Sequence, residues 1–165
     1  MNYMDLTGNN ILKSRHNRDK LSPEELRAVI IDILKEKNIN VTGQRISVME
    51  FLYLDDSHPT AEEVYYAMLK TDDKVARATV YNTINIFEEK GLIRVVGFNE
   101  NVKRYDLYLD EHAHFVCNYC QTIYDVEIPE ILRDSKVFDL PDNVEVESQS
   151  IIIRGKCSNC MNTES

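Results

Sequence analysis

Two cysteine pairs constrain the fold of this 165-residue chain more than any other feature of its sequence. They are Cys117-x-x-Cys120 and Cys157-x-x-Cys160, and together they hold all four cysteines. Two C-x-x-C motifs supply four thiolates at the tetrahedral geometry that Zn²⁺ prefers in structural sites. Because the second pair lies close to the C-terminus, we expect a structural zinc to tie that end of the chain to the segment 112–128.

Two other uses of these cysteines stay open from the sequence alone. Each C-x-x-C pair could be a redox-active dithiol, or the four thiolates could hold an iron–sulfur centre. No residue beside either pair suggests activation of a thiol, and this favours the structural zinc site.

Residues 21–104 carry closely spaced helix signals and are predicted to form one domain. Ser22 and Thr60 are each followed three residues later by a glutamate, which is the pattern of a capping box. Thr42 is a third candidate N-cap. Apolar residues recur at helical spacing behind each of these positions, so we expect three helices in this stretch.

A fourth helix and a hairpin complete this domain. The helix is expected over residues 77–90, because Gly91 stands in the usual glycine position after a helix. Two strand-like segments, 92–98 and 102–108, then flank a polar turn. Short helices that end in a two-stranded hairpin are typical of a winged helix-turn-helix domain.

Residues 105–165 are predicted to form a second, smaller α/β domain, and residues 1–20 a loose arm. The second part holds 12 acidic and 4 basic side chains, so most of the net charge of −9 lies there. The predicted fold class is therefore α+β, a winged helix followed by a small α/β dimerisation domain. The second domain is expected to contain three strands, at 112–117, 122–128 and 144–153, and one short helical stretch near 130–136.

The location of the protein is predicted from its apolar segments. The longest apolar runs are far too short to span a bilayer, and the N-terminus has no apolar core of a secretory signal. We therefore expect a cytoplasmic protein without a membrane partner.

The fourth helix has two different faces. Val80, Ile84 and Phe87 share one face with Thr83 and should pack into the domain, whereas the opposite face carries hydrogen-bonding side chains. Amides, a tyrosine and a cation on an exposed helix before a hairpin indicate a reader of the DNA major groove, although an ordinary solvated surface would look the same. The candidate DNA contacts are Gln44, Arg45, Arg77, Thr79, Tyr81, Asn82, Asn85, Lys103 and Arg104.

A second metal site is indicated by the histidines. His112 and His114 are two residues apart on a predicted strand, so both side chains point to one face while Cys117 points to the other. With a nearby carboxylate, they would form a site separate from the cysteines.

Several motifs in order carry a family resemblance, from about residue 24 to residue 160. They are Thr42-Gly43-Gln44-Arg45, His58-Pro59-Thr60-Ala61, Ala78-Thr79-Val80-Tyr81-Asn82, Arg104-Tyr105-Asp106, His112-Ala113-His114-Phe115-Val116-Cys117, and the last C-x-x-C. In these motifs the chain resembles the ferric uptake regulator (Fur) family of metal-dependent repressors. The resemblance implies a regulatory metal site, suited to Fe²⁺ or Mn²⁺, made by His58, Asp106, His112, His114 and Asp125.

Details of the motifs point to one branch of that family. Aspartate at positions 106 and 125, where iron-uptake regulators usually have glutamate, resembles the peroxide-stress regulators (PerR), as does Asn82. A further metal site of some iron-uptake members is degraded here, with Glu111, Ala113 and Gln149 at its positions. The chain also departs from the family at Gln121, where glycine is usual, and at Ala76, where a polar N-cap is usual.

The function implied by the resemblance is that of a homodimeric, zinc-stabilised transcriptional repressor on double-stranded operator DNA, not an enzyme, with no small organic substrate. Peroxide would relieve repression through oxidation of His58 or His112, two ligands of the Fe/Mn site. The main alternative is an iron-responsive repressor of iron uptake without peroxide sensing. A metalloenzyme and a zinc-stapled protein-binding module are alternatives from other classes.

Overall fold

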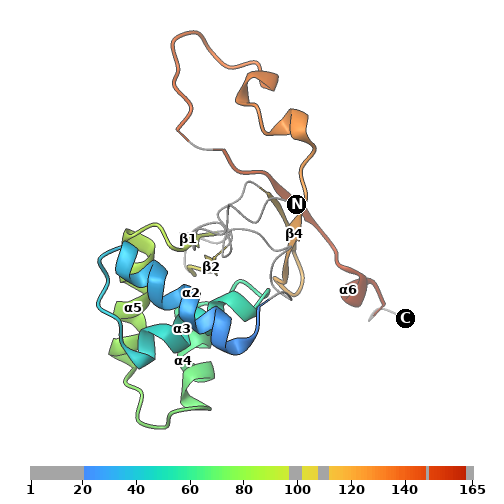
Figure 1. The fold of residues 1–165 in the computed structure, drawn as a ribbon. Coiled ribbons are helices and arrows are strands. Elements are labelled where there is room, and N and C mark those ends of the chain that lie inside the picture. The colour runs from blue at the N-terminus through green and yellow to red at the C-terminus, as the bar shows by residue number, and fades with distance from the viewer. Residues whose placement is uncertain (1–20, 97–101, 108–111, 148, 163–165) are drawn as a thin grey trace. The chain divides into compact units, whose positions relative to one another are not determined.

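The computed structural model describes residues 21–96, 102–107, 112–147 and 149–162, and the chain divides into two compact units, Met1–Asp110 and Glu111–Ser165 (Figure 1). The predicted arm 1–20 and the predicted hairpin turn 99–101 lie outside the described residues. Within the described residues, no helix combines the length and the apolar character that a membrane span requires.

The first unit is built from four helices and a hairpin, as the sequence predicts. Helix α3 contacts the other three helices and forms the centre of the group. The helices are α2 (Pro23–Glu36), α3 (Gly43–Leu54), α4 (Ala61–Leu69) and α5 (Arg77–Glu89).

Side-chain caps fix the start of three helices. Ser22 and Thr60 each accept a hydrogen bond from the backbone amide three residues on, and Glu25 and Glu63 reach back to the cap amides, so both predicted capping boxes are confirmed. Thr42 Oγ1 accepts from the amide of Arg45. Helix α5 has no side-chain cap at Ala76.

Helix α5 is connected to the hairpin by Gly91, whose backbone lies in the left-handed region. Gly91 adopts φ +65°, a conformation that costs glycine little, and the chain then turns into β1 (Arg94–Val95). Strand β1 pairs antiparallel with β2 (Tyr105–Asp106), with Arg94 opposite Asp106.

The core of the first unit is formed by buried aliphatic and aromatic side chains from all four helices and the hairpin. Phe87, Ile84 and Val80 of α5 lie in this core, and Thr83 is buried with them, as predicted for this face. Tyr105 and Leu107 are also part of it. The predicted domain boundary between residues 104 and 105 is therefore too early, because β2 and Leu107 are bound to the first unit by strand pairing and burial.

The second unit contains a three-stranded sheet in the order β4-β3-β5. Its strands are β3 (Ala113–Cys117), β4 (Ile123–Val126) and β5 (Ile152–Gly155). Strand β3 pairs antiparallel with β4 and parallel with β5. The predicted α+β class is confirmed.

Two predictions for the second unit are wrong in detail. The expected strand 144–153 is reduced to β5 because Val144 and Val146 are exposed and the described residues before Ile151 form no strand, whereas the Ile151 carbonyl already accepts from the amide of His114 in β3. The expected helix near 130–136 consists of two short 3₁₀ turns, Glu130–Leu132 and Ser135–Val137, and a short helix α6 (Ser158–Asn162) follows β5.

Candidate metal centres and nucleic-acid interface

Four cysteine sulfurs gather at one end of the sheet of the second unit. The Sγ atoms of Cys117, Cys120, Cys157 and Cys160 lie within 4.8 Å of one another. The Cys117–Cys160 and Cys120–Cys157 sulfur distances are 3.8 and 3.6 Å, which fits four ligands around one tetrahedral ion. All four are free of disulfide bonds.

Strand pairing brings the two cysteine pairs together. Cys117 ends β3 opposite Gly155 of the parallel strand β5, and the amide of Asn118 donates to the Gly155 carbonyl. Cys157 therefore enters beside Cys117, and its amide donates to the Cys117 Sγ at 3.4 Å.

The turn of the first pair contains the unusual Gln121. This residue adopts φ +60°, the left-handed region in which glycine is favoured. Its amide donates to the Cys117 carbonyl, and its side-chain Nε2 donates to the carbonyl of Asn118 at 2.9 Å. Glutamine thus takes the glycine conformation and holds it with a side-chain hydrogen bond.

The neighbouring groups shift the pKa values of these cysteines in different directions. Backbone N–H donation, first of all from Cys120, lowers the pKa of Cys117 to about 6, and the hydroxyl of Thr122 lowers the pKa of Cys120. Contact with the Cys120 side chain raises the pKa of Cys160 to about 12. A bound divalent cation would stabilise the thiolate form of all four.

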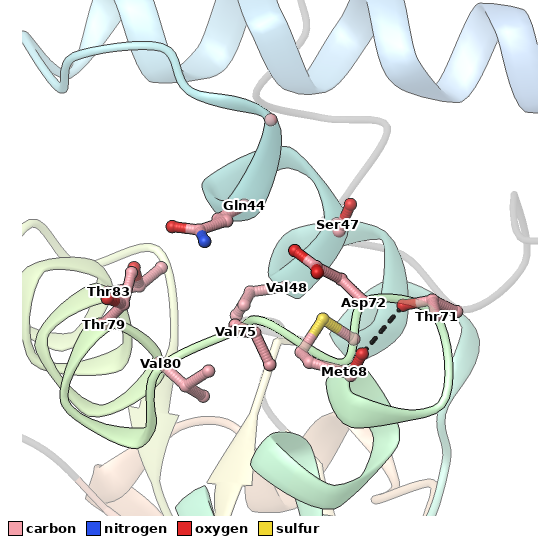
Figure 2. A pocket seen from close by; sticks show the side chains of 11 residues that line it. Gln44, Ser47, Val48, Met68, Thr71, Asp72, Val75, Thr79, Val80 and Thr83 are labelled. Atoms are coloured by element: carbon pink, nitrogen blue, oxygen red, sulfur yellow. Dashed lines mark hydrogen bonds between the residues drawn. The ribbon is translucent and has the colours of Figure 1, made fainter.

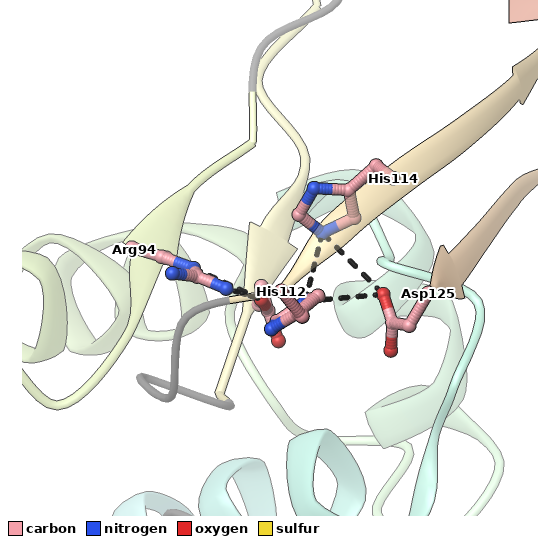
Figure 3. Close-up of polar contacts among 5 residues, drawn as sticks. Arg94, His112, His114 and Asp125 are labelled. Atoms are coloured by element: carbon pink, nitrogen blue, oxygen red, sulfur yellow. Dashed lines mark hydrogen bonds and ion pairs between the residues drawn. The ribbon is translucent and has the colours of Figure 1, made fainter. Parts of the chain in front are cut away.

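A second cluster of donor atoms lies on the same sheet. His112 and His114 meet at 3.0 Å between their Nε2 atoms, and these atoms lie 3.3 and 3.4 Å from Asp125 Oδ1 (Figure 3). His114 is opposite Asp125 in the β3–β4 register. Two imidazole nitrogens and a carboxylate that converge in a nearly buried place form a donor set suited to a divalent transition-metal ion.

Two more predicted ligands lie together in the first unit. His58 and Asp106 are buried, and their donor atoms lie within 4.8 Å of each other. His58 has φ +53° although it precedes a proline, a backbone conformation that costs energy and is held by its surroundings. Arg104 donates to the His58 carbonyl at 2.9 Å, and the amide of Tyr105 donates to the carbonyl of Pro59.

Two arginines in this region have roles that the sequence analysis missed. Arg94 donates from Nε and Nη2 to Asp106 Oδ2, at 3.0 and 2.9 Å (Figure 3). Arg104, one of the candidate DNA contacts, donates to the His58 carbonyl and to Glu63. The signal that could have revealed the first pair is the hairpin, because antiparallel pairing places Arg94 opposite Asp106.

Gln149, which stands at one position of the further metal site of some iron-uptake members, makes a different contact here. Gln149 Nε2 donates to the carbonyls of Leu132 and Arg133, at 2.8 and 3.3 Å, and so ties the segment before β5 to the first 3₁₀ turn. Ala113 is buried in β3, and Glu111 lies outside the described residues.

Helix α5 presents the polar face expected for a major-groove reader. Tyr81, Asn82 and Asn85 are exposed, opposite the buried side of the helix. Thr79 is only partly exposed: together with Gln44 it lines a pocket of about 230 Å³ between the start of α3, the end of α4 and α5 (Figure 2).

The candidate cations around α5 have intramolecular partners. Arg77 lies 3.3 Å from Glu62 and over the ring of Tyr65, and Lys103 pairs with Glu88 at 3.2 Å. Arg45 donates to the Asn40 carbonyl. To bind DNA phosphates, Arg77 and Lys103 would have to give up or share weak, exposed ion pairs, and Arg45 a hydrogen bond to a backbone carbonyl.

Comparison with known proteins gives a consistent result. The model of the family described as "Ferric uptake regulator family" matches residues 36–154. The chain is 28% identical over 144 residues to the peroxide operon regulator of Bacillus subtilis (strain 168), covering 87% of this chain and 99% of the relative. It is 26% identical over 127 residues to the peroxide-responsive repressor PerR of Staphylococcus aureus (strain Mu50 / ATCC 700699), covering 77% and 86%.

The fold of the chain also resembles that of a solved ferric uptake regulator. The structure of the Helicobacter pylori ferric uptake regulator superposes with a TM-score of 0.70 at 23% identity, covering 88% of this chain and 97% of the other, which is a likeness of fold. Since the family match spans well over half of the residues, the chain belongs to the ferric uptake regulator family.

Proposed function

We propose that the protein is a metal-dependent transcriptional repressor that binds operator DNA as a homodimer and responds to peroxide. The observation that carries this proposal is the convergence of His112, His114 and Asp125 next to, but separate from, a complete set of four cysteines. One site has the ligands of a structural zinc, and the other has those of an exchangeable effector ion.

The regulatory ion is proposed to be Fe²⁺ or Mn²⁺. Its ligands are His58 and Asp106 from the first unit and His112, His114 and Asp125 from the second. A nitrogen- and oxygen-rich set of five favours these ions over tetrahedral Zn²⁺. Ligands from both units would make the ion restrict the DNA-binding unit against the other, so that ion and DNA strengthen each other's binding.

DNA binding is proposed for the exposed face of α5. Tyr81, Asn82 and Asn85 would read base edges while Arg77, Gln44 and Arg45 contact phosphates. The remaining proposed contacts are Thr79, Lys103 and Arg104. A repressor of this kind acts on the chromosome, in the cytoplasm.

A homodimer would present two such helices to two DNA half-sites. Support comes from the large apolar side chains that the second unit leaves exposed, since a soluble monomer rarely exposes so many in one small unit. They are Ile131, Val137, Phe138, Leu140, Val144, Val146, Ile152 and Ile153.

Peroxide sensing is proposed to occur at the ligand histidines. Bound Fe²⁺ supplies one-electron reduction of H₂O₂, which Mn²⁺ supplies far less readily. His58 and His112 would hold the ion, so one of their imidazole rings is expected to gain one oxygen atom from H₂O₂ while the other oxygen leaves as water. An oxidised imidazole binds metal poorly, so the two units would be released and repression would end. The 28% identity to a peroxide operon regulator supports this branch.

The test compares the Fe²⁺ and Mn²⁺ forms on a duplex obtained by binding-site selection, each before and after brief exposure to H₂O₂. We expect the Fe²⁺ form alone to leave DNA and to gain 16 Da, about one oxygen atom, on peptides that contain His58 or His112. The peptide of His16 serves as the internal control. DNA binding that depends on metal but withstands peroxide in both forms would leave an iron-responsive repressor as the function.

A further inference from the structure

We propose that Arg94 is a built-in counter-ion of the regulatory site, which competes electrostatically with the metal ion for Asp106 and so weakens ion binding. This inference rests on the proposed function, because it concerns a residue next to a proposed metal ligand. It assigns to Arg94 the role of setting the metal concentration at which the sensor responds.

The geometry of the pair is the first argument. Arg94 and Asp106 are direct cross-strand partners on β1 and β2, so the backbone of the hairpin holds them opposite each other. Two hydrogen bonds from the guanidinium, donated by Nε and Nη2, end on the same carboxylate oxygen, Oδ2. A carboxylate can serve a guanidinium with one oxygen and a metal ion with the other, so Arg94 can stay in place when an ion binds.

The burial of the pair is the second argument. The side chain of Asp106 is only 2% exposed, whereas that of Arg94 is 32% exposed. A buried carboxylate needs a positive partner, and in the absence of an ion Arg94 supplies that charge. The first unit can therefore keep its fold without a metal, as a reversible sensor requires.

The cost for the ion follows from Coulomb's law. A divalent ion bound to Asp106 would be separated from the positive guanidinium of Arg94 only by the carboxylate group. Because Asp106 is buried, water screens the repulsion between ion and guanidinium little. The repulsion offsets part of the attraction of the ion to the Asp106 carboxylate and so lowers its affinity, and neutralising residue 94 should remove it.

The experiment measures binding of Mn²⁺ to the full-length, zinc-loaded chain by isothermal titration calorimetry. Arg94→Gln removes the charge and should tighten Mn²⁺ binding at least tenfold, while the melting temperature of the metal-free protein falls. Arg94→Lys keeps the charge and should bind Mn²⁺ within about threefold of the original protein. Arg27→Gln is the matched control, since it makes the same charge change at the exposed Arg27–Glu50 pair of the same unit, and should not alter the affinity.

Asp106→Asn separates failure of the inference from failure of the proposed function. If the original protein binds Mn²⁺ no better than Asp106→Asn, the proposed metal site is wrong, and the inference falls with it. If Asp106→Asn weakens binding but Arg94→Gln leaves it unchanged or weakens it, only the counter-ion role is overturned.

A folding measurement covers the case in which Arg94→Gln is unfolded without metal. The buried carboxylate would then rely on the ion alone, and Mn²⁺ should restore the far-ultraviolet circular dichroism of the folded protein. An Arg94→Gln chain that stays unfolded at saturating Mn²⁺ would overturn the inference.

Discussion

His58 and Gln121 both hold left-handed backbone conformations beside proposed metal ligands, with φ +53° and +60°. Such conformations cost a residue with a side chain roughly 1 kcal/mol or more, and they persist only where neighbouring contacts fix them. Arg104 supplies that contact at the His58 carbonyl, and the side chain of Gln121 supplies it for its own turn. The two proposed metal sites therefore depend on hydrogen bonds to the backbone as well as on the candidate ligands.

The cysteine cluster gives the first residue-scale prediction. Cys160→Ser should abolish binding of one Zn²⁺ per chain and destabilise the second unit by about 4 kcal/mol or more, because the binding energy of a structural metal is folding energy. Zinc content by mass spectrometry and thermal melting measure this. Met161→Ser changes an exposed neighbour on the same short helix and should keep the zinc. A zinc-free Cys160→Ser protein with an unchanged melting curve would contradict the structural role.

At the scale of the element, the helices of the first unit differ in how their ends are satisfied. Helices α2, α3 and α4 begin with side-chain caps, whereas α5 begins at Ala76 with none. The backbone of Ala76 is extended, with φ −81° and ψ 136°, which is the conformation of an N-cap residue. Helix α5 thus lacks only the side-chain hydroxyl that caps the other helices of the unit.

Ala76→Ser should therefore stabilise the protein by about 1 kcal/mol, because the new Oγ can accept a hydrogen bond from a backbone amide in the first turn of α5. Urea denaturation followed by circular dichroism measures the change. Ala76→Val, which adds volume but no acceptor, should give no such gain. Equal stability of the serine variant and the original protein would show that the amides of this turn are satisfied in another way.

The exposed face of α5 gives a second prediction at this scale. Tyr81→Ala should cost about 1–3 kcal/mol of binding to the selected operator duplex and relax its sequence preference, because a base contact is lost. Fluorescence anisotropy titration measures this, and Glu89→Ala, at the exposed end of the same helix, is the control. Full operator affinity in Tyr81→Ala would mean that another face of the protein reads the bases.

Arg77→Ala tests the phosphate contact proposed for the start of α5. It should weaken all duplexes alike and reduce the slope of log K against log salt by about 1, since one fewer counterion is released. The loss of its pair with Glu62 should matter little for folding, because both side chains are half exposed. A loss confined to the operator sequence would assign Arg77 to base reading instead.

At the scale of the whole molecule, the two units hold their folds by different means. The described core of the first unit is a continuous cluster of buried apolar side chains from four helices and a hairpin. The second unit buries a few residues of its sheet around the cysteines and leaves many large apolar side chains exposed. We therefore expect its stability to depend largely on the proposed zinc ion and on the proposed partner subunit.

Removal of zinc should consequently destabilise the second unit and leave the stability of the first unit largely unchanged. With a strong chelator, amides of Glu111–Ser165 should lose hydrogen-exchange protection, while α2, α3 and α5 of the first unit keep theirs. Exchange measured by mass spectrometry resolves the two regions, and re-addition of Zn²⁺ is the control. Loss of protection in both units at the same rate would show that they unfold as one.

Much of the first unit could be predicted because its signals are local. A capping box spans four residues, and an apolar stripe spans one helix, so the helix starts at Ser22, Thr42 and Thr60 are visible in the sequence itself. The prediction of a long third strand over 144–153 in the second unit is wrong for the opposite reason. The alternation around Val144 and Val146 looks like a strand, but a strand forms only where another strand accepts its hydrogen bonds.

Short patterns in the chain are enough to identify the chemical groups that the protein carries and the starts of its helices: two C-x-x-C pairs, an H-x-H pair on one strand face, and capped amphipathic helices. These features depend on spacings of a few residues, which backbone geometry converts directly into positions. Long-range contacts appear in the fold alone: β5 runs parallel to β3 and joins the two cysteine pairs, Arg94 lies opposite Asp106, and Arg104 donates to the carbonyl of His58. These contacts join residues between 12 and 46 positions apart, and such pairings depend on strand register and packing of the whole unit, which no local pattern encodes.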